Sequence, residues 1–452
     1  MTSAARASVA PLYLLACLLL GGSAQGVWQN ALLQILGLAI IAWAAAWPPA
    51  QTFPRSARPV LWIAFAAIVV VALQCIPLPP SVWAHGARQP IAEGYVLLGQ
   101  PIPNLPLSLT PYKSLGSLLS LIPPLAMFCA IARLRAYRST WLAAALLGGA
   151  IAGILLGILQ VVGTAANPRW YPYPETNFGA AVGFFANANH MAMLLVIALP
   201  FAAAIGSARS QRNLQRASAL LAALAGVGLL LLMGIALNGS IAAFALAPPV
   251  LAASALILFR PSPTLRKLVG AVAVALLAGG LVLLSTSSIG ATKIGSDARE
   301  SVASRTEILR TTGRAIADYF PAGSGLGSFR QVYRTYESPD AVTNEYVIHA
   351  HNDYAELILE LGAAGLVLMA MFLAWWGAAV WGVWGRGEGG PYVRAASIAS
   401  AVLLTHSLVE FPLRTAALAV VFAMCVALLA DRRRSQTPEL ADLRPTRHVV
   451  IG

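Results

Sequence analysis

The side chains best suited to chemistry gather in one polar stretch, residues 349–360, directly before a long apolar run. His351 can act as a general base near neutral pH and take a proton from a hydroxyl group. Asn352, Glu356 and Glu360 follow at intervals of four residues, so one face of a helix starting near residue 351 would carry all three. This grouping indicates a site, although the two glutamates could instead form ordinary ion pairs with arginines of a neighbouring loop.

Arginines that suit an anionic ligand precede this stretch. The planar guanidinium group binds phosphate in a bidentate way and keeps its charge when partly desolvated. Six arginines lie in the segment before residue 349: Arg299, Arg305, Arg310, Arg314, Arg330 and Arg334. Acidic residues share this segment, so we expect most of the arginines to form surface ion pairs and one or two to bind a ligand.

A second polar group follows further along the chain. His406 and Glu410 come at the end of an apolar run and are followed by Arg414, so we expect them to line the same cavity. His349 and His351 would point to opposite sides of a strand, and no third ligand follows at a metal-binding spacing. The sequence therefore predicts neither a metal site nor a cofactor.

The segment Gly323–Ser328 is rich in glycine, with the sequence Gly-Ser-Gly-Leu-Gly-Ser. Such a turn could let the backbone approach a phosphate, but a turn that ends a helix is the commoner reading. No strand-to-helix unit surrounds it, so it is not a nucleotide-binding fingerprint.

Composition defines the elements that must position these residues. The 452 residues are 58% hydrophobic and only 10% charged, and the mean hydropathy is +0.72. These values predict an all-α polytopic transmembrane helix bundle. The net charge of +13 comes from arginines and lysines in short gaps between apolar runs, a topology signal rather than a nucleic-acid surface.

About twelve apolar runs are long enough to cross a membrane. They are Val9–Ser23, Val27–Trp47, Pro59–Ile76, Lys113–Ile131, Trp141–Val162, His190–Gly206, Ala217–Leu237, Ile241–Phe259, Leu265–Leu284, Ala355–Trp384, Ala395–Val409 and Leu413–Ala430. Basic residues follow the even-numbered runs, which predicts that those connectors and both termini are cytoplasmic. Three long connectors, 77–112, 163–189 and 285–354, then lie outside the cytoplasm.

The longest outer connector, 285–354, should be partly helical and carry site residues. Asp297 with Glu300 resembles a helix cap, and the helix should stop before Pro321. We expect residues 1–434 to form a single transmembrane domain and residues 435–452 a disordered cytoplasmic tail.

At these residues the sequence resembles the O-antigen ligase family, polytopic enzymes related to O-antigen polymerases. Three segments carry the resemblance, 304–329, 351–368 and 405–414, with a looser fourth at 183–200. The resemblance implies transfer of a glycan from an undecaprenyl-diphosphate carrier to an acceptor hydroxyl, such as that of lipid A-core. It also implies a metal-independent, inverting reaction on the periplasmic side of the bacterial inner membrane.

The resemblance also suggests residue roles. The family's histidine falls on His351 and its arginine on Arg305, and we expect Asn352 and Glu356 to bind substrate. Members often carry a Ser-Arg pair at the outer start of a mid-chain helix, where this chain has Ser240 followed by isoleucine. Either another group replaces it, with Arg310, Arg314 and Arg414 as candidates, or this chain uses a different donor or has a different activity.

Two alternative functions remain open. A polymerase of the same fold would share the motifs, because ligase and polymerase differ in the acceptor. A secondary transporter would suit twelve spans equally well, but transporters usually place polar residues at the bilayer midplane in related halves. Here the polar residues gather at the outer ends of the spans.

Overall fold

The computed structural model describes residues 2–432, apart from 25, 48–51, 163–167, 211–213, 340–345 and most of 260–292. The described residues form helices and no β-strand, with only two isolated β-bridges. The α-helices are α1 (Ser3–Ala7), α2 (Val9–Leu20), α3 (Trp28–Ala46), α4 (Arg58–Gln74), α5 (Pro80–Trp83), α6 (Gln89–Leu97), α7 (Pro111–Leu119), α8 (Ile122–Ala132), α9 (Ser139–Val162), α10 (Ala188–Ser210), α11 (Leu214–Asn238), α12 (Ile241–Leu258), α14 (Lys293–Tyr319), α15 (Phe329–Tyr336), α16 (Asp353–Trp384), α17 (Pro391–His406) and α18 (Ala416–Ala430).

These helices confirm the predicted all-α membrane bundle. Eight helical segments of the described chain are long and apolar enough to cross a membrane, and 222–238 and 416–430 are shorter apolar helices. Eleven of the twelve predicted runs coincide with described helices, the fourth being divided between α7 and α8. The ninth, Leu265–Leu284, lies largely outside the described residues, as does the predicted tail at 435–452.

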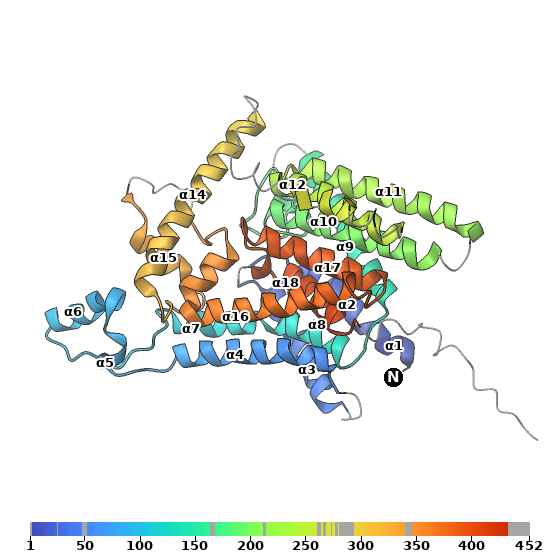
Figure 1. Cartoon of the computed structure of the whole chain (residues 1–452). Helices are drawn as coiled ribbons and strands as arrows, with labels where there is room; N and C mark the ends of the chain where they lie inside the picture. The colour runs from blue at the N-terminus through green and yellow to red at the C-terminus, as the bar shows by residue number, and fades with distance from the viewer. Residues whose placement is uncertain are drawn as a thin grey trace, which may run out of the picture.

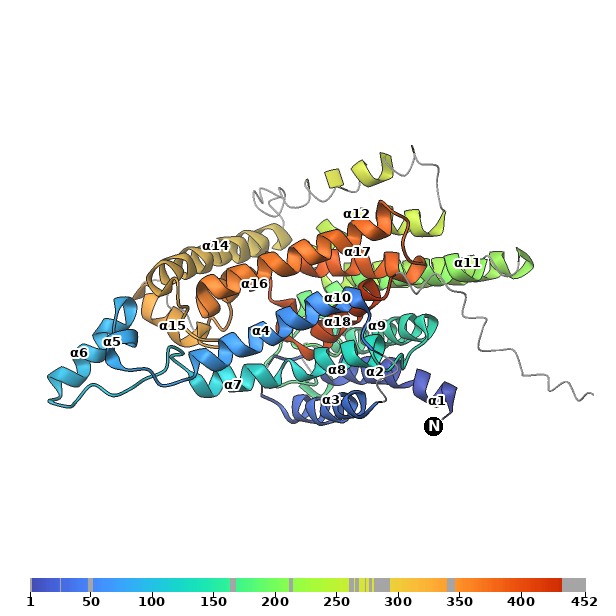
Figure 2. The same cartoon turned by 60° about the horizontal axis from the view of Figure 1, so that its bottom comes forward.

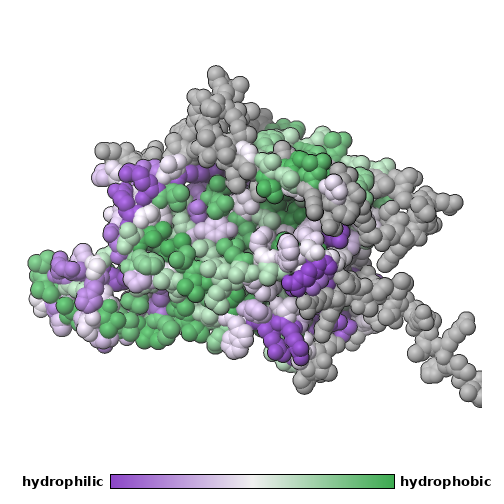
Figure 3. Space-filling view, viewed as in Figure 1, coloured by the Kyte–Doolittle hydropathy of each residue, from purple (hydrophilic) through white to green (hydrophobic). Residues whose placement is uncertain are grey.

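Helix α10 forms the centre of the bundle. It packs against α9, α11, α12 and α17. In its most apolar 18-residue stretch, 89% of the residues are buried inside the bundle. Helices α4 and α16 lie side by side nearer the surface, running along the length of the molecule (Figure 1). A broad hydrophobic face covers this region, with hydrophilic residues towards its two ends, as expected for a bundle surrounded by lipid (Figure 3).

Helices from the long connectors 77–112 and 285–354 lie over one end of the bundle. Helices α5, α6, α14 and α15 gather at the end remote from the N-terminus (Figure 2), and α14 packs against α16. The predicted start of α14 was wrong, because the helix begins at Lys293 and Asp297 lies inside it. A capping residue is preferred at a helix start but is also tolerated within a helix, so its position alone does not define the boundary.

Helix α16 is broken at Gly362, where φ is +61° and ψ is −139°. The glycine-rich segment fills the break: the N–H of Ser324 donates to the Leu359 carbonyl and that of Gly325 to the Glu360 carbonyl, both at 2.9 Å. Ala363 in turn donates to the carbonyl of Pro321 at 2.9 Å. The turn therefore uses its N–H groups to satisfy the broken helix, which supports the structural reading of this segment over a phosphate cradle.

We predict that Gly362→Ala destabilises the fold. A Cβ atom at this position would lie 2.0 Å from the Pro321 carbonyl oxygen, and the left-handed backbone alone costs an alanine about 1–2 kcal/mol. Thermal unfolding of the purified protein in detergent measures the effect. Gly377→Ala in the same helix is the matched control, because nothing lies within 4 Å of its added Cβ. Equal melting temperatures for the two variants would contradict the interlocked turn.

Candidate active site

Glu410 is a buried carboxylate that joins two residues singled out from the sequence. Its side chain is 1% exposed, and its Oε1 accepts a hydrogen bond of 2.6 Å from Nη2 of Arg305. The Nδ1 atom of His351 lies 3.3 Å from Oε2 of the same carboxylate. The structure thus brings His351 and Arg305 together on one negative charge. We call Glu410, Arg305, His351 and Asn189 the Glu410 cluster.

Asn189 links this cluster to the start of α12. Its Nδ2 donates to Oε1 of Glu410 at 2.8 Å, and its Oδ1 accepts from the Ser240 hydroxyl at 2.7 Å. Ser240 also caps α12 by accepting from the Ala243 N–H. Ser240, where the resemblance leads us to expect a Ser-Arg pair, is therefore connected to Arg305. The connection runs through the side chains of Asn189 and Glu410.

The cluster fixes the charge of Glu410. Burial raises the pKa of this carboxyl group, but the His351 imidazole and the Arg305 guanidinium outweigh burial and hold the pKa well below its usual range. A depressed pKa means that the carboxylate stabilises the fold above its unfolded pKa and that this contribution is lost only as the pH falls into the acid range. Glu410 is therefore ionised at neutral pH.

Arg414 is the centre of a second cluster. Its guanidinium lies 3.5 Å from Asp353, 3.3 Å from Glu356 and 3.2 Å from Glu360, each distance measured to a carboxylate oxygen. Glu356 also pairs with Nδ1 of His349 at 2.9 Å. We call these five residues the Arg414 cluster.

One cation holding three buried carboxylates is a strong electrostatic constraint. Burial opposes the charge of Arg414, but Glu356, Glu360 and Asp353 outweigh it and raise the pKa of the guanidinium. Backbone N–H groups also donate hydrogen bonds to these carboxylates. Glu360 accepts from the Gly327 N–H at 2.8 Å, and Glu356 accepts from the Ala350 N–H at 2.9 Å. The cluster therefore fixes the residues before and at the start of α16.

Phe411 joins the two clusters through its ring. The ring centroid of His349 lies 4.3 Å from that of Phe411, and the His351 centroid lies at 5.2 Å. The prediction that the two histidines point apart was wrong, because the chain here is not a strand and His351 has a φ of +49°. His190 of α10 packs on the same ring at 5.1 Å.

Two other predicted residues lie at or near these clusters. Asn352 is the N-cap of α16: its Oδ1 accepts from the Ala355 N–H and its Nδ2 donates to the Leu408 carbonyl, both at 2.9 Å. The helix therefore begins just after the predicted position. His406 ends α17 and is fully buried, and neither ring nitrogen has a hydrogen-bond partner among the described residues.

Arg310 and Arg314 lie elsewhere on α14. Arg310 is exposed and pairs with Glu307 at 2.8 Å. Arg314 donates to the Thr311 hydroxyl and to the Tyr336 carbonyl, both at 3.1 Å. Of the three arginines proposed to replace the missing Ser-Arg arginine, Arg414 is the one that the described structure places among buried acidic groups.

Sequence reasoning overlooked several residues that build the site. Glu410 was expected to line the cavity but not to pair with His351 and Arg305, and Asn189 was given no role. Asp353 and Phe411 were given no role, although Phe411 contacts three histidines. The available signal was the polar and aromatic composition of segment 405–414, since a short stretch with Glu410, Phe411 and Arg414 is unusual beside an apolar run.

The fold and clusters define a class, a polytopic membrane protein with a buried ionic site at one end of its helices. Residues 226–370 match the family described as O-antigen ligase. The match includes Arg305 and His351, whereas Glu410 and Arg414 lie beyond it. No curated protein matches the chain. The family match supports a membrane enzyme of ligase or polymerase type.

We predict that Arg414→Met strongly destabilises the protein, because three buried carboxylates lose their shared cation. Removing one partner of a buried ion pair costs about 3–5 kcal/mol. Chemical unfolding in detergent at neutral pH measures the loss. Arg310→Met removes an exposed ion pair and should cost less than about 1 kcal/mol. Losses of similar size in the two variants would show that Arg414 is not a structural centre.

Proposed function

We propose that this protein is a glycosyltransferase that moves a glycan from an undecaprenyl-diphosphate carrier to an acceptor hydroxyl, such as that of lipid A-core. The observation that supports this proposal most strongly is that one carboxylate, that of Glu410, pairs with both His351 and Arg305. The pair lies at the end of the bundle covered by the outer connector. A base and a phosphate-binding cation side by side are what such a transfer requires.

His351 is the proposed general base. Its Nδ1 faces Glu410, and we assign its other ring nitrogen, Nε2, to the acceptor hydroxyl. Nε2 takes the hydroxyl proton while the acceptor oxygen bonds to the anomeric carbon. The bond between that carbon and the diphosphate oxygen breaks, and the diphosphate leaves with the electron pair. Attack opposite the leaving group inverts the anomeric centre. The Glu410 carboxylate stabilises the imidazolium that forms.

Arg305 is the proposed partner of the leaving diphosphate. Only one of its N–H groups is engaged with Glu410 in the hydrogen bond described above, and its side chain is 29% exposed. A guanidinium has five N–H donors, so others remain to neutralise the developing negative charge. Arg305 is also connected to Ser240, where the resemblance leads us to expect a Ser-Arg pair, through Asn189 and Glu410.

The Arg414 cluster is the proposed support of the substrate site. Arg414 holds Glu356, which holds His349, and Asn352 caps the same helix. We propose that Asn352 and Glu356 orient substrate groups at this helix start. His406, buried behind Glu410, completes the lining.

The orientation is part of the proposal. Arginines after the even-numbered spans favour cytoplasmic connectors at the end opposite the site. The two clusters would then face the periplasm from the inner membrane, with both termini in the cytoplasm. A lipid-linked donor suits this side, because nucleotide-activated sugars are cytoplasmic.

A polymerase of the same fold is the second candidate. Lipid-linked glycan in a deletion strain separates the two: long chains that fail to reach the cell-surface core indicate a ligase, and accumulated single repeats indicate a polymerase. Transport is a third candidate. Uptake of a radiolabelled solute into liposomes, without consumption of lipid-linked glycan, would support transport and contradict the glycosyltransferase.

We predict that His351→Ala abolishes transfer without loss of membrane-inserted protein. Removing a general base typically costs 10²–10⁴-fold in rate. The assay measures glycan transfer from purified lipid-linked donor by the purified variant. His85→Ala is the matched control, since His85 is an exposed histidine of another outer connector, with its Nε2 at 2.7 Å from the Ser81 carbonyl oxygen. Normal transfer by His351→Ala would remove histidine from the mechanism.

We predict that Glu410→Gln slows transfer, because the neutral amide does not stabilise the imidazolium that His351 forms when it takes the acceptor proton. The amide has nearly the same size as the carboxylate, so the change removes the negative charge and keeps the packing. Initial rates of glycan transfer by the purified variant at neutral pH measure the loss, and a wild-type rate would contradict the pairing.

A further inference from the structure

A basic surface lies on α15, separate from both clusters. Arg330 and Arg334 lie one turn apart, with their guanidinium carbons 5.5 Å and 4.9 Å from the ring centroid of Tyr346, which is 71% exposed. Lys113, at the start of α7, lies within electrostatic reach of both arginines. We call these four residues the α15 patch.

The described part of the chain provides no carboxylate beside the cations of the α15 patch. Among the described residues, no carboxylate lies within 4.0 Å of Lys113, Arg330 or Arg334. By contrast, Arg310 and Arg305 in the same outer connector each pair with a glutamate. Three neighbouring cations repel one another, and an anion bound between them would relieve the repulsion.

The place of the patch restricts the ligand. Lys113 lies near the start of the candidate span Pro111–Ala132, and the adjacent Tyr112 is 69% exposed, as is common for an aromatic residue at a membrane interface. Helix α15 belongs instead to the outer connector, at the hydrophilic end of the molecule (Figure 3). A ligand that contacts both Lys113 and the arginines of α15 must have an anionic group at the lipid border and must extend outward from that border.

The patch is also connected to the Arg414 cluster. A Cβ added to Gly327 would lie 3.3 Å from the Cβ of Lys113, so the glycine turn packs directly on α7. The Gly327 N–H donates to Glu360, whose other oxygen pairs with Arg414. A ligand on the patch would therefore bind beside an element that is joined to the proposed site.

We propose that the α15 patch binds the phosphate- or carboxylate-bearing sugar headgroup of a lipid-anchored acceptor. This inference rests on the proposed function, since it assigns the acceptor a binding site. Paired arginine forks bind such anions in a bidentate way. A lipid-anchored headgroup would bring its anionic groups to the lipid border, where Lys113 lies beside the two arginines.

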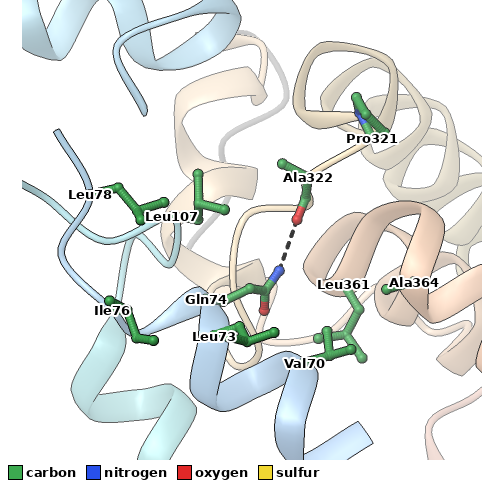
Figure 4. Close-up of a pocket in the computed structure, with 10 residues that line it drawn as sticks. All are labelled: Val70, Leu73, Gln74, Ile76, Leu78, Leu107, Pro321, Ala322, Leu361 and Ala364. Carbon is green, nitrogen blue, oxygen red and sulfur yellow. Dashed lines mark hydrogen bonds between the residues drawn. The ribbon is translucent and has the colours of Figure 1, made fainter. Parts of the chain in front are cut away.

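A pocket near this end of the bundle is lined by uncharged residues. It has a volume of about 440 Å³ and is lined mainly by apolar side chains of α4, the following loop and the break in α16. Gln74 crosses it to donate to the Ala322 carbonyl at 2.9 Å (Figure 4). Its apolar lining does not suit an anion, so the α15 patch is the surface that fits a charged headgroup.

The test measures binding of diphosphoryl lipid A to the purified full-length protein by native mass spectrometry. We expect Arg330→Glu combined with Arg334→Glu to weaken binding at least tenfold, and Arg310→Glu, the same kind of substitution at an exposed arginine of α14, to leave it unchanged. Wild-type binding should also weaken as salt is added. The milder pair Arg330→Gln and Arg334→Gln gives the same comparison if charge reversal prevents folding.

Three results would overturn the inference. These are wild-type affinity in both double variants, equal weakening by Arg310→Glu, and binding of phosphatidylglycerol as tight as that of lipid A, which would remove the sugar from the proposal. The test is independent of catalysis, because His351→Ala should bind lipid A like the wild type. Failure of the wild type to transfer glycan from lipid-linked donor would overturn the proposed function and leave the binding result standing.

Discussion

A carboxylate buried at the end of an apolar bundle must be neutralised, and this requirement organises the site. Leaving an ionised carboxylate without a partner in such surroundings is prohibitively costly, so each one must have a cation beside it. Glu410 has Arg305 and His351, and three acids of α16 share Arg414. Residues far apart in the sequence are thereby brought to one end of the molecule.

The backbone makes these pairings possible. The break at Gly362 opens α16 to the glycine-rich turn, whose N–H groups bind the freed carbonyls and the Glu360 carboxylate. The positive φ of His351 places its ring against Phe411, next to His349. Conformational restrictions that cost free energy locally are offset by the ionic contacts they permit.

Much of this arrangement follows from local sequence, and the remainder depends on contacts between distant segments. Helical spacing correctly placed Glu356 and Glu360 on one face, and Pro321 correctly limited α14. Spacing could not identify their partner Arg414, which lies 54 residues beyond Glu360. Arg310 was one candidate for the missing arginine, but its side chain is exposed and pairs with Glu307. The histidine geometry was missed because a strand was assumed where His351 is left-handed.

The central claim is that Glu410 acts on His351 as well as on Arg305. A double-mutant cycle on kcat/KM for glycan transfer tests it most directly, using His351→Ala, Glu410→Gln and the double variant in purified protein. The account predicts strong coupling, so that the cost of Glu410→Gln becomes much smaller once the histidine is absent. Costs that simply add, with the glutamine variant losing the same factor in both backgrounds, would contradict it.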